Sequence, residues 1–195
     1  INVELCDDLG DGAVKNVGKL AMLFEEDQRL GLKEAMLSTA SVINELSQNS
    51  SAGARYLEEF TARVAGVGKQ AGMTQAQIMG FAAVLDENMQ QEETSATAFS
   101  QLITKMYQEP AKFAQIAGKD VQEFTSLLNE DANEALHTFF QAMRDQGGFD
   151  KLAPMFTEMG LEGSRATAVL TSIADKLDNV RKMQRLASES YEEAT

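Results

Sequence analysis

Apolar side chains recur along this chain at intervals of three and four residues, which places them on one face of an α-helix. No comparable stretch alternates with period two, so we expect no β-sheet. The first five apolar stripes are Val14, Val17, Leu20 and Phe24; Leu32, Met36, Thr39, Ile43 and Leu46; Leu57, Phe60, Val64 and Val67; Ile78, Ala82, Leu85 and Met89; and Phe99, Leu102, Ile103 and Met106. The pattern predicts an all-α, multi-helical module.

Glycine and polar capping residues predict where these helices end. Thr74 with Gln77 forms a capping-box pattern, and Asp120 with Glu123 repeats it with an Asx cap. Three phrases place a glycine two residues before a polar residue that can open the next helix: Ala71-Gly72-Met73-Thr74, Ala117-Gly118-Lys119-Asp120 and Met159-Gly160-Leu161-Glu162. We expect breaks near 48–52, 71–74, 108–110, 117–120, 146–149 and 159–163.

The last segment has a heptad-like spacing that we call the seam. From Ala166 its positions are Leu170, Ile173, Leu177, Val180, Gln184, Ala187, Tyr191 and Ala194. No Gly or Pro follows Gly163, so we expect one long coiled-coil-like helix over 163–195 that continues past the end of the sequence. We predict that this helix projects and binds a partner through Leu170, Ile173, Leu177 and Val180. In the alternative, it folds back and buries the seam within its own chain.

The chain accordingly divides into a helical lead-in (1–30), a core module (31–162) and the C-terminal helix (163–195). Because it begins at Ile1 and ends within a helical pattern, we expect it to be a fragment of a longer protein. Apolar residues make up 44% of the chain, enough to bury a core. No apolar run approaches the roughly 20 residues of a membrane-spanning helix, and no signal peptide opens the chain.

The net charge of -13 argues against a generic nucleic-acid binder and against an anionic membrane surface. Cys6 is the only cysteine, so no internal disulfide is possible. His137 is the only histidine, and we expect it on a helix surface or at the edge of the core. We expect no catalytic site, metal or cofactor.

Some local patterns favour a site only weakly. Glu134 and His137 have the Glu-x-x-His spacing of di-metal helix bundles, but such a site needs the motif twice. Asp7, Asp8 and Asp11 lack the spacing and closing Glu of a calcium loop. The glycines of Gly66-x-Gly68 lack a preceding strand and the dinucleotide spacing, so we interpret them as a close helix approach or a helix end.

Three stretches carry a resemblance to a known family. Residues 70–89 read QAGMTQAQIMGFAAVLDENM, residues 103–136 read ITKMYQEPAKFAQIAGKDVQEFTSLLNEDANEAL, and residues 149–177 read FDKLAPMFTEMGLEGSRATAVLTSIADKL. In this order they resemble the helical core region of phage tail tape-measure proteins, including the G-hydrophobic-x-G-x-R-A phrase at 160–166. The similarity covers roughly residues 30–185 and carries over no catalytic residue.

The resemblance implies a structural protein of the phage virion tail, made and assembled in the bacterial cytoplasm. Such a protein sets tail length and assists tail assembly and DNA delivery. Its partners would be further copies of itself, bound through the C-terminal helix, and other tail proteins. Two alternatives remain open: a helical adaptor or scaffold module of a bacterial protein, and an enzyme subunit or cofactor bundle.

Overall fold

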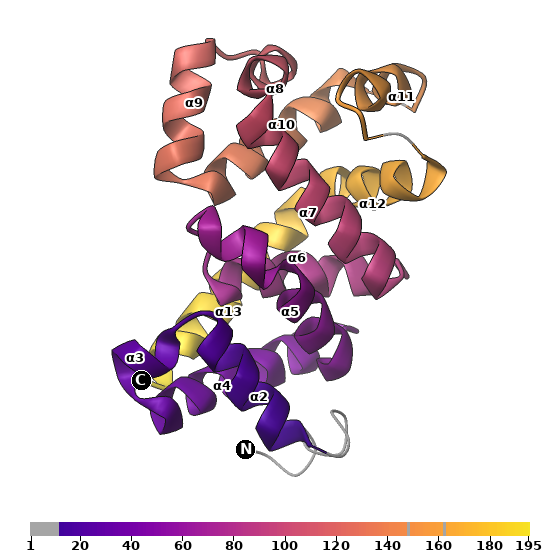
Figure 1. Ribbon diagram of the computed structural model, residues 1–195. Helices are drawn as coiled ribbons and strands as arrows, with labels where there is room; N and C mark the ends of the chain where they lie inside the picture. The colour runs from indigo at the N-terminus through magenta and orange to yellow at the C-terminus, as the bar shows by residue number, and fades with distance from the viewer. Residues whose placement is uncertain (1–11, 148, 162) are drawn as a thin grey trace.

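A computed structural model describes residues 12–147, 149–161 and 163–195. Among these residues 84% are helical, in twelve helices and with no strand, so the all-α prediction is confirmed. The helices are α2 (Ala13–Leu23), α3 (Glu26–Leu30), α4 (Leu32–Asn49), α5 (Ala54–Gln70), α6 (Gln75–Glu87), α7 (Glu92–Gln108), α8 (Pro110–Ala117), α9 (Val121–Glu130), α10 (Ala132–Gln146), α11 (Phe149–Glu158), α12 (Ser164–Asp175) and α13 (Leu177–Glu193) (Figure 1).

All six predicted helix breaks are confirmed. The Thr74–Gln77 capping box is present in both directions, and Asp120 accepts from the backbone N–H groups of Gln122 and Glu123. Gly72, Gly118 and Gly160 have positive φ at the helix ends predicted for them. Further breaks at 24–25, 31, 88–91, 131 and 176 were not predicted.

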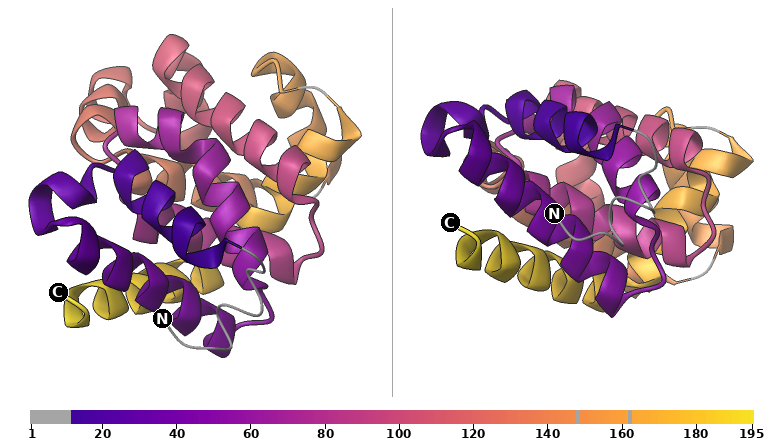
Figure 2. Two further views of the ribbon diagram at one scale, coloured as in Figure 1. Left: turned by 60° about the horizontal axis from the view of Figure 1, so that its bottom comes forward. Right: turned by 90° about the horizontal axis from the view of Figure 1, so that it is seen from below.

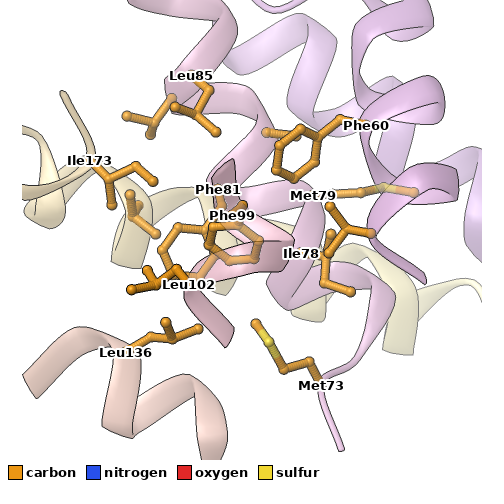
Figure 3. Close-up of a cluster of buried hydrophobic side chains, with 14 of the residues drawn as sticks. Phe60, Met73, Ile78, Met79, Phe81, Leu85, Phe99, Leu102, Leu136 and Ile173 are labelled. Atoms are coloured by element: carbon orange, nitrogen blue, oxygen red, sulfur yellow. The ribbon is translucent and has the colours of Figure 1, made fainter. Parts of the chain in front are cut away.

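Helix α6 lies at the centre of the molecule. Ten of its thirteen residues are buried, because its sequence is apolar on nearly every face. Helices α4, α5, α7, α12 and α13 pack around it (Figures 1 and 2). The ring of Phe81 lies 4.8 Å from that of Phe99, which in turn lies 5.8 Å from Phe60 (Figure 3). The core is therefore organised around this helix.

Helices α8 to α11 form the other part of the molecule, at the top of Figure 1. Phe113 of α8 packs on Phe139 of α10, with ring centroids 5.3 Å apart. Phe139 contacts Phe140, which reaches Phe81 of α6. One continuous apolar cluster runs from Ala13 to Ala187, so the three segments divided by sequence contribute to a single core.

Three members of the predicted apolar stripes are exposed: Val14, Leu32 and Met89. Val14 lies in the first turn of α2 and Leu32 is the first residue of α4. Met89 lies beyond the end of α6. Val14 thus points away from the face on which its neighbour Ala13 is buried, and Leu32 and Met89 lie at helix ends.

The predicted long C-terminal helix is divided in the structure. A turn at Lys176 separates α12 from α13, and both helices lie against the module instead of projecting from it (Figures 1 and 2). Helix α13 runs along α6 and α4. This corrects the expectation of a single projecting helix, and the physical reason is that α6 offers an apolar face without a large side chain at Gly80.

Gly80 sets the distance between α6 and α13. A Cβ built there would lie 2.9 Å from the backbone nitrogen of Gln184 and 3.0 Å from its Cα, closer than real Cβ atoms pack. Gly68 likewise faces Ile78 of α6, which confirms a close approach for one glycine of the Gly66-x-Gly68 pair.

We expect Gly80→Ala to lower the free energy of unfolding by roughly 1–3 kcal/mol, because the new methyl group must push the backbone of α13 away. Gly66→Ala is the matched control: it lies in the middle of an exposed helix face with no atom near its built Cβ. That substitution should raise stability by about 0.5–1 kcal/mol. Urea unfolding of both variants checks this, and equal effects would contradict a close contact at Gly80.

Candidate functional site

The four residues predicted to bind a partner lie in the interior. Leu170 and Ile173 belong to α12, Leu177 and Val180 belong to α13, and all four are buried. Figure 3 shows Ile173 among the side chains around Phe81. The turn at Lys176 divides the four between two helices, and these helices pack on α4, α6, α7 and α10. This placement favours the alternative in which the seam is an internal core, and none of the four is accessible to a partner.

The polar member of the seam, Gln184, connects three helices through its side-chain amide. Its Nε2 donates to the backbone carbonyl of Gln77 on α6 at 3.0 Å and to Oδ1 of Asn133 on α10 at 2.7 Å. Its Oε1 lies 2.8 Å from Nε2 of His137 on α10. Since an amide oxygen only accepts, His137 donates through Nε2–H. The group of Gln77, Asn133, His137 and Gln184 is called the polar junction below.

His137 is fully buried, with 0% of its surface exposed, which corrects its predicted position at the core edge or surface. Its ring lies 5.6 Å from that of Phe81, and its Nδ1 has no hydrogen-bond partner among the described residues. Burial lowers the pKa of His137, and the positive charge of Arg181 lowers it further. Its charged neighbours are Arg181, Glu134 and Asp131. The imidazole is therefore held neutral inside the fold.

Glu134 does not share a site with His137. Its two carboxylate oxygens accept from the guanidinium of Arg181 at 3.2 and 3.0 Å, in a pair that ties α10 to α13. Within the described ranges, no group of three or more His, Cys, Asp or Glu side chains is placed to hold a metal ion. Cys6, Asp7, Asp8 and Asp11 lie outside the described residues.

A surface hollow of about 680 Å³ lies between α7 and the beginning of α12. Its lining includes Gln91, Thr94, Gln101 and Arg165. The hollow also holds the carboxylate of Glu93 and the hydroxyl of Ser164, but none of the hydrogen bonds among the described residues joins a hydroxyl group of this lining to that carboxylate. As for membranes, none of the helices described here has the length and apolar content needed to cross a bilayer.

Comparison with known protein families places the described fold in a family context. A family model described as phage-related minor tail protein matches residues 10–148. The chain belongs to this family. Neither the curated proteins nor the solved structures give a match. The family assignment identifies a component of the phage tail and supports the expectation of a structural protein.

The matched region ends at residue 148, but later helices are also part of the fold of this tail protein. Residue 148 follows α10, whereas α6 is covered by α12 and α13, which come later in the chain. The sequence interpretation missed Gly80 and the polar junction. A lone glycine inside an otherwise apolar helix was the available signal for the first. Gln184 in an apolar seam was the signal for the second.

We expect Leu177→Glu to unfold the tail protein and not to release a folded monomer. The change removes buried apolar volume and places a carboxylate in the core, at a cost of roughly 3–5 kcal/mol. Asn179→Glu, two residues along α13 and on its exposed face, should change stability by less than about 0.5 kcal/mol. Circular dichroism and sedimentation check both. The opposite result would be a wild-type chain that associates and a Leu177→Glu variant that is a folded monomer. That result would place the seam on an assembly surface.

We expect His137 to make the tail protein less stable in acid. Because its folded pKa lies below the unfolded value of about 6.5, the unfolded chain binds the proton more readily. The stability that depends on a neutral His137 is fully present above pH 6.5 and is lost as the pH falls towards the pKa of His137 in the folded state. His137→Gln should cost about 1–2 kcal/mol at pH 7.5. Since the sequence has a single histidine, the variant should lose less stability than the wild type between pH 7.5 and 5.5. Identical losses would show that His137 is not held neutral.

Proposed function

We propose that this chain is a structural, non-catalytic module of a phage tail tape-measure protein. The match to the phage-related minor tail protein family over residues 10–148 carries the proposal. The similarity of residues 70–89, 103–136 and 149–177 to the tape-measure core narrows it from a tail component to the length-determining one. In this role the parent protein sets tail length and assists tail assembly and DNA delivery.

The physical basis of a ruler supports the proposal. A helix advances about 1.5 Å per residue, so the length of a helical chain can fix the length of a tube. The described chain is 84% helical, with short connections, and because its helices pack around one core, the ruler role requires them to be laid end to end in the tail. The two residues with the Glu-x-x-His spacing serve the fold instead: His137 lies in the polar junction and Glu134 pairs with Arg181.

The partners we propose are other proteins of the virion tail, met during assembly in the bacterial cytoplasm. The net charge of -13 supports contact with protein surfaces over contact with the phosphates of DNA. The buried seam argues against self-association through Leu170, Ile173, Leu177 and Val180. Contacts to other proteins therefore come from exposed surfaces of the module.

We expect an in-frame deletion of residues 12–193 from the parent gene to shorten the tail tube. A ruler that is helical throughout its length would lose up to about 1.5 Å for each deleted residue. Electron microscopy of purified tails measures the change. An in-frame duplication of the same segment is the matched control and should lengthen the tube. Tails of normal length from both alleles would contradict the ruler and leave the module as a tail component of another kind.

A further inference from the structure

The connection between α12 and α13 is a single residue, Lys176, and no helix-breaking residue lies beside it. Its backbone, with φ -114 and ψ 26, lies outside the helical region but needs no glycine. Every other connection between consecutive described helices has a glycine, a proline, a capping side chain or a residue with positive φ. Sharp bends in helices normally have a local cause of this kind. The bend at Lys176 is therefore imposed by packing.

The seam continues through this bend without a change in its spacing. Intervals of three and four residues connect Leu170, Ile173, Leu177, Val180, Gln184 and Ala187. In one unbroken helix over residues 164–193 these side chains would share a face. That segment contains no glycine or proline, so its sequence favours the unbroken helix. A change in the backbone angles of Lys176 alone converts the bent pair of helices into a straight one.

The surface beneath α13 is specific for this helix. The backbone of Gln184 comes so close to Gly80 that a Cβ built on the glycine would lie 2.9 Å from the nitrogen of Gln184. The side chain of Gln184 also bonds the carbonyl of Gln77 and the side chains of Asn133 and His137. A helix of different sequence would leave the buried imidazole without its hydrogen-bond acceptor, at a cost in free energy. The structure itself therefore identifies what this surface binds, which is the sequence of α13.

We propose that two copies of this chain exchange α13: each copy straightens at Lys176, and its α13 docks on α6 of the other copy. The exchanged dimer keeps the contacts of α13 with α4, α6 and α10, so association needs no additional surface. It also restores the helical bonding pattern at Lys176, whose N–H in the bent form reaches back only three residues, to Ile173 at 3.2 Å. A hinge of one residue favours exchange, because it has no slack to relieve the bend. Leu177 and Val180 stay buried in both forms, which distinguishes the exchange from a coiled coil between exposed seams.

A disulfide can report which copy supplies α13. The hydroxyl oxygens of Ser41 on α4 and Ser190 on α13 lie 2.6 Å apart, so cysteines at these positions should be close enough to bridge. The Ser41→Cys/Ser190→Cys variant also carries Cys6→Ser, which removes the native cysteine. After refolding at high concentration and oxidation, we expect disulfide-linked dimers on a non-reducing gel; after refolding at high dilution, we expect bridges within single chains. Bridges within single chains at every concentration would overturn the exchange.

A second test needs no disulfide and uses the ion pair between Arg181 on α13 and Glu134 on α10. Arg181→Glu and Glu134→Arg each place like charges together, both in the monomer and in a dimer of one variant. When the two variants are refolded together, the exchanged heterodimer has opposite charges at both contacts. We expect native mass spectrometry to find heterodimers several-fold above their statistical proportion. Heterodimers at or below that proportion would contradict docking of α13 on the other copy.

Lys176→Gly tests the hinge. Glycine disfavours the straight helix, which only the dimer requires, so the association constant should fall roughly tenfold. Lys182→Gly is the matched control, because this exposed residue of α13 is helical in both forms and its replacement should leave the constant unchanged. Sedimentation equilibrium measures both constants, and equal values for the two variants would overturn the straightened hinge. The tail role has its own test in tail length, so a strictly monomeric chain would leave that role standing.

Discussion

The approach of α13 to α6 at Gly80 determines how the rest of this fold can pack. Helix α6 is apolar on nearly every face, so it is stable only where neighbours cover it on all sides. Helices α4, α5 and α7 cover part of it, and α13 covers the face on which Gly80 lies. Without a Cβ at this position the backbones come close enough to exclude water. The hydrophobic effect acting on one helix thus fixes the positions of several others.

The polar junction fixes how α13 is oriented on α6 within this apolar contact. Burial of an amide and an imidazole costs free energy unless both are hydrogen-bonded. Gln184 meets that condition through Gln77, Asn133 and His137, which lie on two different helices. A rotation of α13 by one residue would break all of these bonds at once. The junction therefore specifies the register of α13, whereas the surrounding Leu, Val and Phe side chains supply most of the attraction.

Local chemistry explains which parts of the fold could be predicted from the sequence. Most breaks marked by glycine, proline or a capping side chain were predicted, because those residues act on their own backbone, although the break at Gly31 was not. The break at Asp131, which was not predicted, carries the same signal: Asp131 accepts from the N–H of Glu134, just as Asp120 does from that of Glu123. Lys176 carries no such signal, so the division of the last helix was not predictable.

Tertiary contacts account for the misplacement of the seam and of His137. The spacing of Leu170 to Val180 correctly marks these residues as an apolar helical pattern, but periodicity does not say which surface covers them. His137 and Gln184 lie 47 residues apart, and nothing local to either one indicates the other.

The long separation between α6 and α13 also governs the order in which the chain can fold. The bonded residues Gln77 and Gln184 are 107 positions apart. At about 5–20 residues per second of synthesis, α6 leaves the ribosome roughly 5–20 seconds before the helix that covers it. Throughout that interval one apolar face of α6 stays in water while α7 to α12 emerge. The native arrangement of α6 is thus reached only when translation of this segment is nearly complete.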